Sequence, residues 1–225
     1  MDFKDKFLDF VKKNNPKWEI KGLLSCDKDV LVFGSDTKVL STIFELLCKP
    51  IVLSIAKELG YQIEEAPQTV YPDFTLLRNK EDKEKIAVDI KTTYRKILTN
   101  GSVSPFGFTL GSYTSFIRNG TKNIRYPYSD YKEHWIIGFV YTRNLPENIS
   151  LSYKLSEFEE IPCPYKDVEF FVQEKYKIAG LKPGSGNTTN IGSIKTSNID
   201  DFRVGKGAFA KKGEKAFLNY WRKYK

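Results

Sequence analysis

Residues 71–91 constrain the fold most, because they have the pattern of two strands joined by a charged turn. Apolar residues alternate with polar ones in residues 73–76 and again in residues 86–91. Strict alternation of this kind is typical of a half-buried β-strand. Residues 78–84 between them contain no apolar side chain, as expected of a loop. We therefore predict a β-hairpin over this segment.

The predicted hairpin brings charged side chains together. If it is centred on Glu81, Asp73 lies opposite Asp89, with their Cβ atoms about 5 Å apart. Lys91 shares that face, about 6.5 Å further along the strand. Like charges placed opposite each other destabilise a sheet, but a hard cation such as Mg²⁺ is held by one or two carboxylates. The pattern fits either an exposed ion triad on a solvated sheet or a metal-dependent site for phosphodiester hydrolysis.

Basic residues are concentrated in two parts of the chain. The formal net charge is +8, and residues 91–129 contain no acidic side chain. Residues 201–225 contain eight Lys or Arg against two acids, Asp201 and Glu214. Charge that serves only solubility would not be expected to segregate in this way. The distribution therefore favours a polyanion as partner.

Several functional classes are excluded by composition. The single histidine, His134, argues against a His-based zinc site or a serine triad. Cys26, Cys48 and Cys163 have no metal-type spacing and are expected to be reduced thiols. We find no apolar run of membrane-spanning length and no signal-peptide core, so no membrane partner is expected.

The remaining periodicities predict an α/β (α+β) chain that folds as one domain over residues 1–225. Asp36 or Ser35 is expected to cap a helix over residues 37–49, which Pro50 stops or kinks before it continues to residue 59. We also predict helices over 3–14 and 214–225, short strands within 18–33, a buried central strand at 135–141, and a strand pair at 168–172 and 176–179.

Glu45 is predicted to lie on the polar face of the 37–49 helix. The opposite face carries Val39, Leu40, Ile43, Phe44, Leu46 and Leu47. Seen from the sequence alone, this polar face is a solvated surface.

Two polar segments suit contact with DNA. Residues 184–190, Gly-Ser-Gly-Asn-Thr-Thr-Asn, include asparagines that can pair with adenine and threonines that can contact a thymine methyl. The alternative is a flexible surface loop. Residues 92–94 are expected to open a loop, and residues 108–119 are rich in hydroxyl groups that suit phosphate contacts. An ordinary polar junction between loop and helix is the alternative there.

Taken together, these residues resemble the EcoRV-type type II restriction endonucleases of the PD-(D/E)xK nuclease superfamily. Pro72-Asp73 with Asp89-Ile90-Lys91 matches the superfamily signature, and residues 33–46, 89–94, 113–119 and 184–193 carry the more specific likeness. The resemblance implies a restriction-endonuclease-like core, with a mixed central sheet flanked by helices and a small dimerisation subdomain near residues 18–33 and 145–162.

The resemblance also implies an activity and its partners. A homodimer would cut double-stranded DNA at a GATATC-like palindrome, bluntly, leaving 5′-phosphate and 3′-hydroxyl ends. Mg²⁺ would be the cofactor, with Mn²⁺ as a possible substitute. A companion DNA methyltransferase and the cytoplasm of a prokaryotic cell are expected.

Residue roles follow from the same likeness. Asp73 and Asp89 would bind metal with Glu45 as a third acid, and Lys91 would position or activate the water. A major-groove loop would contain Gly184, Ser185, Gly186, Asn187, Thr188, Thr189 and Asn190. Gln68 would lie near the minor groove. Backbone contacts would come from Thr92, Thr93, Tyr94, Thr114, Ser115 and Lys122.

Two alternatives remain at this point. A repair or junction-resolving nuclease with the same core would nick DNA without preference for a palindrome. A non-enzymatic DNA-binding module would leave DNA intact in the presence of Mg²⁺.

Overall fold

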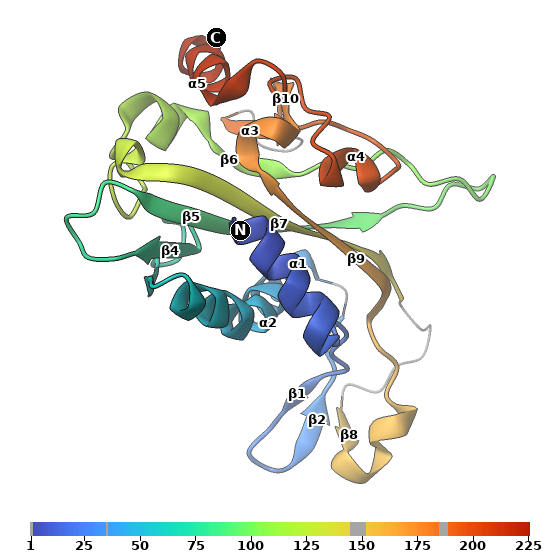
Figure 1. The fold of residues 1–225 in the computed structure, drawn as a ribbon. Coiled ribbons are helices and arrows are strands. Elements are labelled where there is room, and N and C mark those ends of the chain that lie inside the picture. Colours follow the sequence, from blue (N-terminus) through green and yellow to red (C-terminus); the bar gives the residue numbers. More distant parts are fainter. Residues whose placement is uncertain (1, 35, 145–151, 185–188) are drawn as a thin grey trace.

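A mixed β-sheet forms the centre of the protein (Figure 1). The computed structural model describes residues 2–34, 36–144, 152–184 and 189–225. The sheet has five strands in the order β3-β4-β5-β7-β9. They are β3 (Gln62–Glu65), β4 (Phe74–Leu77), β5 (Lys85–Arg95), β7 (Tyr131–Arg143) and β9 (Tyr165–Glu174). β5 and β7 are parallel and the other neighbours are antiparallel. The predicted mixed sheet flanked by helices is thus confirmed.

Two helices cover one face of this sheet (Figure 1). They are α1 (Phe3–Asn14) and α2 (Thr37–Glu58). Asp36 caps α2, since its Oδ1 accepts hydrogen bonds from the backbone N–H groups of Lys38 at 2.9 Å and Val39 at 3.2 Å. Ser35, the other predicted cap, lies outside the described residues. The helix continues through Pro50 without ending.

The predicted apolar face of α2 is only partly correct. Leu40, Ile43 and Phe44 are buried, but Leu46 is 62% exposed and Val39 is also exposed. Contrary to the expectation from the sequence, α2 is long and apolar enough to cross a membrane by length and composition. Because its inner face packs into the core beneath the sheet, these two properties alone are weak grounds for a membrane span.

The opposite face of the sheet carries a second layer. A three-stranded sheet has the order β10-β11-β6, formed by β10 (Ala179–Pro183), β11 (Asn190–Ser193) and β6 (Thr109–Ser112). Short helical turns cover Tyr113–Ile117 and Tyr128–Asp130, and the helices are α3 (Lys175–Ile178), α4 (Asp200–Arg203) and α5 (Gly213–Lys223). The strand predicted at 176–179 is wrong, because most of it is the helical turn α3.

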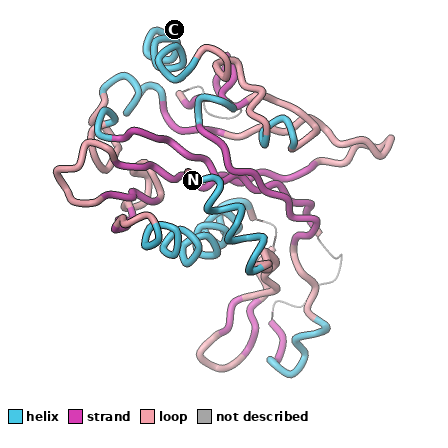
Figure 2. The backbone as a smooth tube through the Cα atoms, viewed as in Figure 1, coloured by secondary structure: helices cyan, strands magenta, loops and turns pink. Residues whose placement is uncertain are grey.

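A third, smaller sheet projects away from the main body (Figure 2). It contains β1 (Leu23–Leu24), β2 (Asp29–Leu31) and β8 (Ser152–Lys154), followed by a helical turn at Leu155–Glu160. The ion pair between Lys154 Nζ and Asp29 Oδ1, 2.7 Å apart, joins β8 to β2. Segments more than 100 residues apart in the sequence therefore meet in this projection.

The hairpin strands are more buried than their alternation predicts. All four residues of β4 and the first six of β5 are buried, so these strands are not half-exposed. Packed layers therefore cover both sides of the sheet here, and a polar side chain is buried whichever side it faces. Residues 92–94 do not open a loop, because β5 continues to Arg95 beside β7. Residues 62–65, which the sequence analysis did not assign to a strand, form β3.

Candidate active site

The hairpin has the predicted register. Phe74 pairs with Val88, Thr75 with Ala87 and Leu76 with Ile86. Asp73 immediately precedes β4, and its Oδ2 accepts a 2.6 Å hydrogen bond from the backbone N–H of Ile90. Asp73 is thereby held beside the part of β5 that carries Asp89 and Lys91.

Asp89 and Lys91 form an ion pair within this site. Asp89 is 2% exposed, and its Oδ2 lies 2.7 Å from Lys91 Nζ. This ammonium is the partner that offsets the burial of the Asp89 carboxylate. The two charges are therefore held together beside Asp73.

The titration of the site reflects its burial and its crowding. Burial, followed by the charge of Asp89, raises the pKa of Asp73 to about 7. Burial alone would lower the pKa of Lys91, but Asp89 and Asp73 together raise it above its ordinary value. Lys91 therefore remains an ammonium, a donor of hydrogen bonds and positive charge.

A cavity of about 260 Å³ opens beside these three residues. Its other lining residues include several that the sequence analysis did not select: Tyr71, Gly111, Ser112, Phe116 and Asn123. Two signals were visible in the sequence: Tyr71 directly precedes Pro72-Asp73, and Gly111, Ser112 and Phe116 lie in the hydroxyl-rich residues 108–119. Asn123 had no such signal, and the fold brings it to the hairpin.

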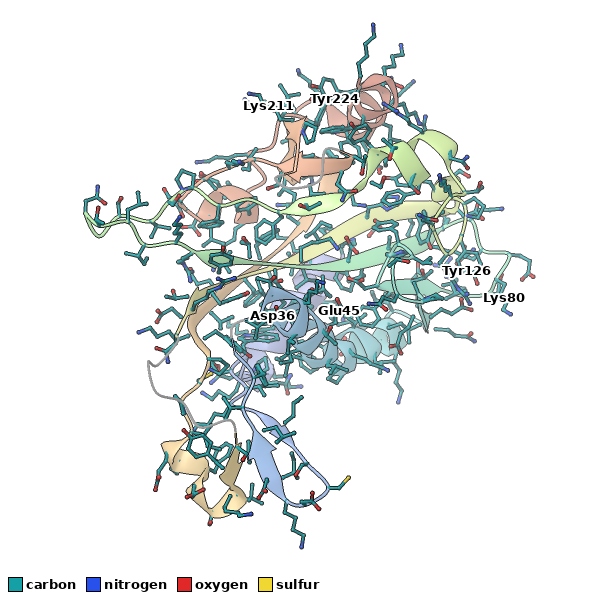
Figure 3. The ribbon with its side chains drawn as sticks, turned by 180° about the vertical axis from the view of Figure 1, so that it is seen from behind. Asp36, Glu45, Lys80, Tyr126, Lys211 and Tyr224 are labelled. Atoms are coloured by element: carbon teal, nitrogen blue, oxygen red, sulfur yellow. The ribbon has the colours of Figure 1, made fainter. Side chains whose placement is uncertain are left out.

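Glu45 lies on a neighbouring cavity. This second cavity, of about 370 Å³, is lined by Glu45, Asp73 and Gln68 among others. Glu45 lies on α2 beneath the central sheet (Figure 3). Burial raises its pKa, and the charges of Lys91 and Asp89 act on it in opposite directions. Glu45 is therefore close to the acid pair and half-buried, rather than on a fully solvated face.

The donor set suits a hard divalent cation. Within the described residues, no group of three or more His, Cys, Asp or Glu side chains is placed to hold a metal ion. Asp73 and Asp89 supply two carboxylates, and Mg²⁺ is commonly bound by one or two carboxylates together with water and phosphate oxygens. Glu45 as a third ligand stays a prediction.

Asn190, the last residue of the predicted recognition loop, borders the cavity of the acid pair. Ser185, Gly186, Asn187 and Thr188 lie outside the described residues. The backbone N–H of Gly184 donates a 2.9 Å hydrogen bond to the carbonyl of Asn190, and Asn190 lines the cavity of Asp89 and Lys91. The carbonyl of Thr189 accepts a 3.1 Å hydrogen bond from the N–H of Tyr113.

The residues predicted to contact the DNA backbone differ in burial. Thr92, Thr93 and Tyr94 are half-buried on β5, directly after Lys91. Thr114 and Lys122 are exposed. Ser115 is buried, and its hydroxyl donates a 2.6 Å hydrogen bond to the carbonyl of Lys122. Ser115 also lines the cavity, so it connects the segment around Lys122 with the acid pair.

Comparison with known proteins identifies the family to which the sequence is similar. The family model "Restriction endonuclease EcoRV" matches residues 14–225. The chain is also 50% identical, over 226 residues, to the type II restriction enzyme EcoRV of Escherichia coli. That alignment covers 100% of this chain and 89% of the relative.

Proposed function

The chain belongs to the EcoRV restriction endonuclease family, and from that premise we propose that it is a Mg²⁺-dependent homodimer that cuts both strands of a short palindrome. As a type II restriction endonuclease of the EcoRV type, it is a site-specific deoxyribonuclease and its partner is DNA. The observation that carries the proposal is the meeting of Asp73, Asp89 and Lys91 at one cavity. The proposed target is GATATC or a close variant, cut bluntly.

The three residues have two proposed roles. Asp73 and Asp89 would hold the cation, with Glu45 as a third acid. A bound Mg²⁺ supplies Lewis-acid polarisation of the phosphate. Lys91, kept protonated by the two carboxylates, donates to the oxygen on which negative charge develops or holds the attacking water in place. This favours an electrostatic role for Lys91 over that of a base.

Base recognition is proposed for the 184–190 loop. Asn187 would pair with an adenine edge and Thr188 would contact a thymine methyl. Support comes from the two ends of the loop, Gly184 and Asn190, which are joined by a hydrogen bond beside the cavity. Gln68, on the neighbouring cavity, is proposed to lie toward the minor groove. Thr92, Thr93, Tyr94, Thr114, Ser115 and Lys122 are proposed to follow the DNA backbone.

Replacing a base-reading side chain provides a direct test of this loop. Asn187→Ala should lose about 1–3 kcal/mol of discrimination per base contact. The measurement is the ratio of cleavage rates on the cognate site and on sites with one substituted base pair. A ratio equal to that of the wild type would exclude Asn187 from base recognition.

Dimerisation is proposed through residues 18–33 and 145–162, whose described part contains the projecting sheet β1-β2-β8. Its support is a set of exposed apolar side chains on this sheet and its helical turn: Leu23, Leu24, Leu31, Leu155 and Phe158. A two-fold dimer presents two active sites to a palindrome, one for each strand. We propose that the whole chain, residues 1–225, acts as one domain within that dimer.

The decisive experiment is cleavage of a DNA of known sequence. The protein is incubated with Mg²⁺ and the DNA, and the product ends are sequenced. Blunt fragments with 5′-phosphates at one palindrome are expected. Scattered nicks would contradict the proposal and favour the repair-type nuclease. DNA from the host should resist cleavage at the same palindrome if a companion methyltransferase protects it.

A further inference from the structure

Residues 66–70, called here the Gln68 segment, have little packing of their own. Pro67, Gln68 and Thr69 are exposed, and Thr69 has a left-handed backbone conformation with a φ of 72°. A β-branched residue rarely adopts that conformation, so the surrounding structure has to enforce it. Within the segment, the N–H of Val70 donates a 3.1 Å hydrogen bond to the carbonyl of Pro67. The position of the Gln68 segment is therefore set largely by its neighbours.

Three donor groups converge on one carboxylate oxygen just before this segment. Glu64 on β3 accepts hydrogen bonds at its Oε2 from Arg125 Nε and from the Tyr126 hydroxyl, both at 3.0 Å. The Nη2 of Arg125 lies 2.9 Å from the same oxygen. Burial acts to raise the pKa of Glu64, but the hydrogen bonds from Arg125 and Tyr126 lower it below its ordinary value. Glu64 is therefore ionised at neutral pH, and these hydrogen bonds are of the stronger, charge-assisted kind.

The same stretch of chain holds the other end of the Gln68 segment through its backbone. The N–H of Arg125 donates a 2.8 Å hydrogen bond to the carbonyl of Tyr71, and the N–H of Tyr71 donates a 3.0 Å hydrogen bond to the carbonyl of Asn123. Ile124, between them, pairs with Tyr71 in an isolated parallel bridge. Residues 123–126, called here the strap, thus contact the chain on both sides of the Gln68 segment.

The strap is itself anchored to the hairpin. Lys85 is fully buried, and its Nζ lies 4.2 Å from the ring centroid of Tyr126. The same Nζ donates a 2.9 Å hydrogen bond to the carbonyl of Lys80 in the hairpin turn, and Tyr126 and Lys80 lie at the same edge of the molecule (Figure 3). The strap therefore offers a fixed support against which the Gln68 segment can be held.

We propose that Arg125 is a positioning residue that, with Tyr126 and the strap backbone, fixes the Gln68 segment for contact with the minor groove. Arg125 is not among the residues that line either cavity of the candidate active site, whereas Thr69 and Val70 line both. Arg125 thus acts through the segment rather than on the reacting phosphate. The inference rests on the proposed role of Gln68, and its first test uses neither DNA nor metal.

The first test measures backbone hydrogen exchange. A partly exposed ion pair adds little to global stability, so the effect is sought in local opening. The amides of Ala66, Val70 and Tyr71 donate hydrogen bonds and are expected to be protected. Arg125→Met should speed exchange over residues 66–71 several-fold, because Glu64 loses the guanidinium that holds it. Unchanged exchange would overturn the proposal.

A double-mutant cycle shows whether Arg125 acts through Glu64. Glu64→Leu should speed the same exchange, and the double variant should exchange no faster than the faster single variant. Effects that multiply would show two independent losses and refute the proposal. Arg203→Met is the matched control, because the Arg203 side chain is also 40% exposed and pairs at 2.8 Å with Asp200 on α4. This control should leave exchange over residues 66–71 unchanged, and an equal increase would count against a specific role for Arg125.

The second test measures single-turnover cleavage of the proposed site and of duplexes with one substituted base pair. Arg125→Met should lower the ratio of the two rates several-fold, and should lower it no further in a Gln68→Ala background. An equal fall in rate on every duplex would indicate a direct phosphate contact and overturn the proposal. An unchanged ratio in Arg125→Met beside a lowered ratio in Gln68→Ala would refute this inference alone. An unchanged ratio in Gln68→Ala would refute the proposed contact of Gln68 as well.

Discussion

At the scale of single residues, burial changes the proton affinity of Asp73 in the candidate active site. Its pKa is raised to about 7 by burial and then by Asp89, whereas an ordinary aspartate has a pKa near 4. The folded protein therefore holds this proton more tightly than the unfolded chain. Between about pH 4 and pH 7 the Asp73 carboxyl loses its proton in the unfolded chain but keeps it in the folded protein. Folding stability therefore falls as the pH rises through this range.

The first prediction concerns this pH dependence. Asp73→Asn removes the ionisation, so the variant should be more stable than the wild type at pH 8 by about 1–3 kcal/mol. Below pH 4 the Asp73 carboxyl is protonated in both the folded and the unfolded state. The difference in stability between the variant and the wild type should then vanish. Urea unfolding at both pH values, without metal, measures it. Equal stabilities at pH 8 would mean that Asp73 ionises at its ordinary pKa.

The second prediction separates cutting from binding. Lys91→Ala removes the ammonium beside Asp89, and cleavage should fall by about 10²-fold or more while specific DNA binding persists. Single-turnover cleavage and a gel-shift assay measure the two properties. Lys96→Ala, an exposed lysine just beyond β5, is the control. Full activity of Lys91→Ala would remove Lys91 from the mechanism.

At the scale of elements, the hairpin shows what a sequence can and cannot reveal. Its register was predictable because apolar alternation fixes both strands and the turn contains no competing apolar residue. Burial of both faces was not predictable, because the covering layers come from α2 and from distant segments such as β6. Arg125 was equally hidden: an arginine in a polar loop is typical of a solvated surface, and only the fold brings it to Glu64.

The third prediction tests the packing of the central strands. Gly138 on β7 lies opposite Phe171 on β9, and a Cβ added at Gly138 would overlap the Phe171 ring. Gly138→Ala should therefore destabilise the fold by about 1–3 kcal/mol. Gly34→Ala is the control, because no atom lies within 4 Å of its added Cβ. Thermal unfolding compares the two; equal melting temperatures would show that Phe171 can move aside.

At the scale of the whole molecule, two surfaces have different chemistry. The projecting sheet exposes apolar side chains, while the acid-pair cavity opens among polar segments that include Ser112 and Asn190. Self-association through the first surface would leave the second available to DNA. Both surfaces are formed by parts of the chain that lie far apart in the sequence. Periodicity within one segment could not predict them, and the dimerisation region was expected only from the resemblance.

The fourth prediction tests the proposed dimer. Leu24 is 63% exposed on the projecting sheet, and Leu24→Glu should shift the protein toward monomer and reduce double-strand cleavage in favour of nicks. Val204→Glu is a matched control, because Val204 is 64% exposed and follows α4 on the opposite layer. Analytical ultracentrifugation measures the change. A dimer unaffected by Leu24→Glu would place the interface elsewhere.

The hydrogen bond between Gly184 and Asn190 has a consequence for fidelity. Asn190 is paired with Ser112, and both border the cavity of the acid pair. If residues 184–190 contact the bases as proposed, a DNA sequence that changes the position of Asn190 would also change one wall of the cavity beside Asp89 and Lys91. Discrimination between DNA sequences would then affect the rate of cleavage as well as the lifetime of the complex.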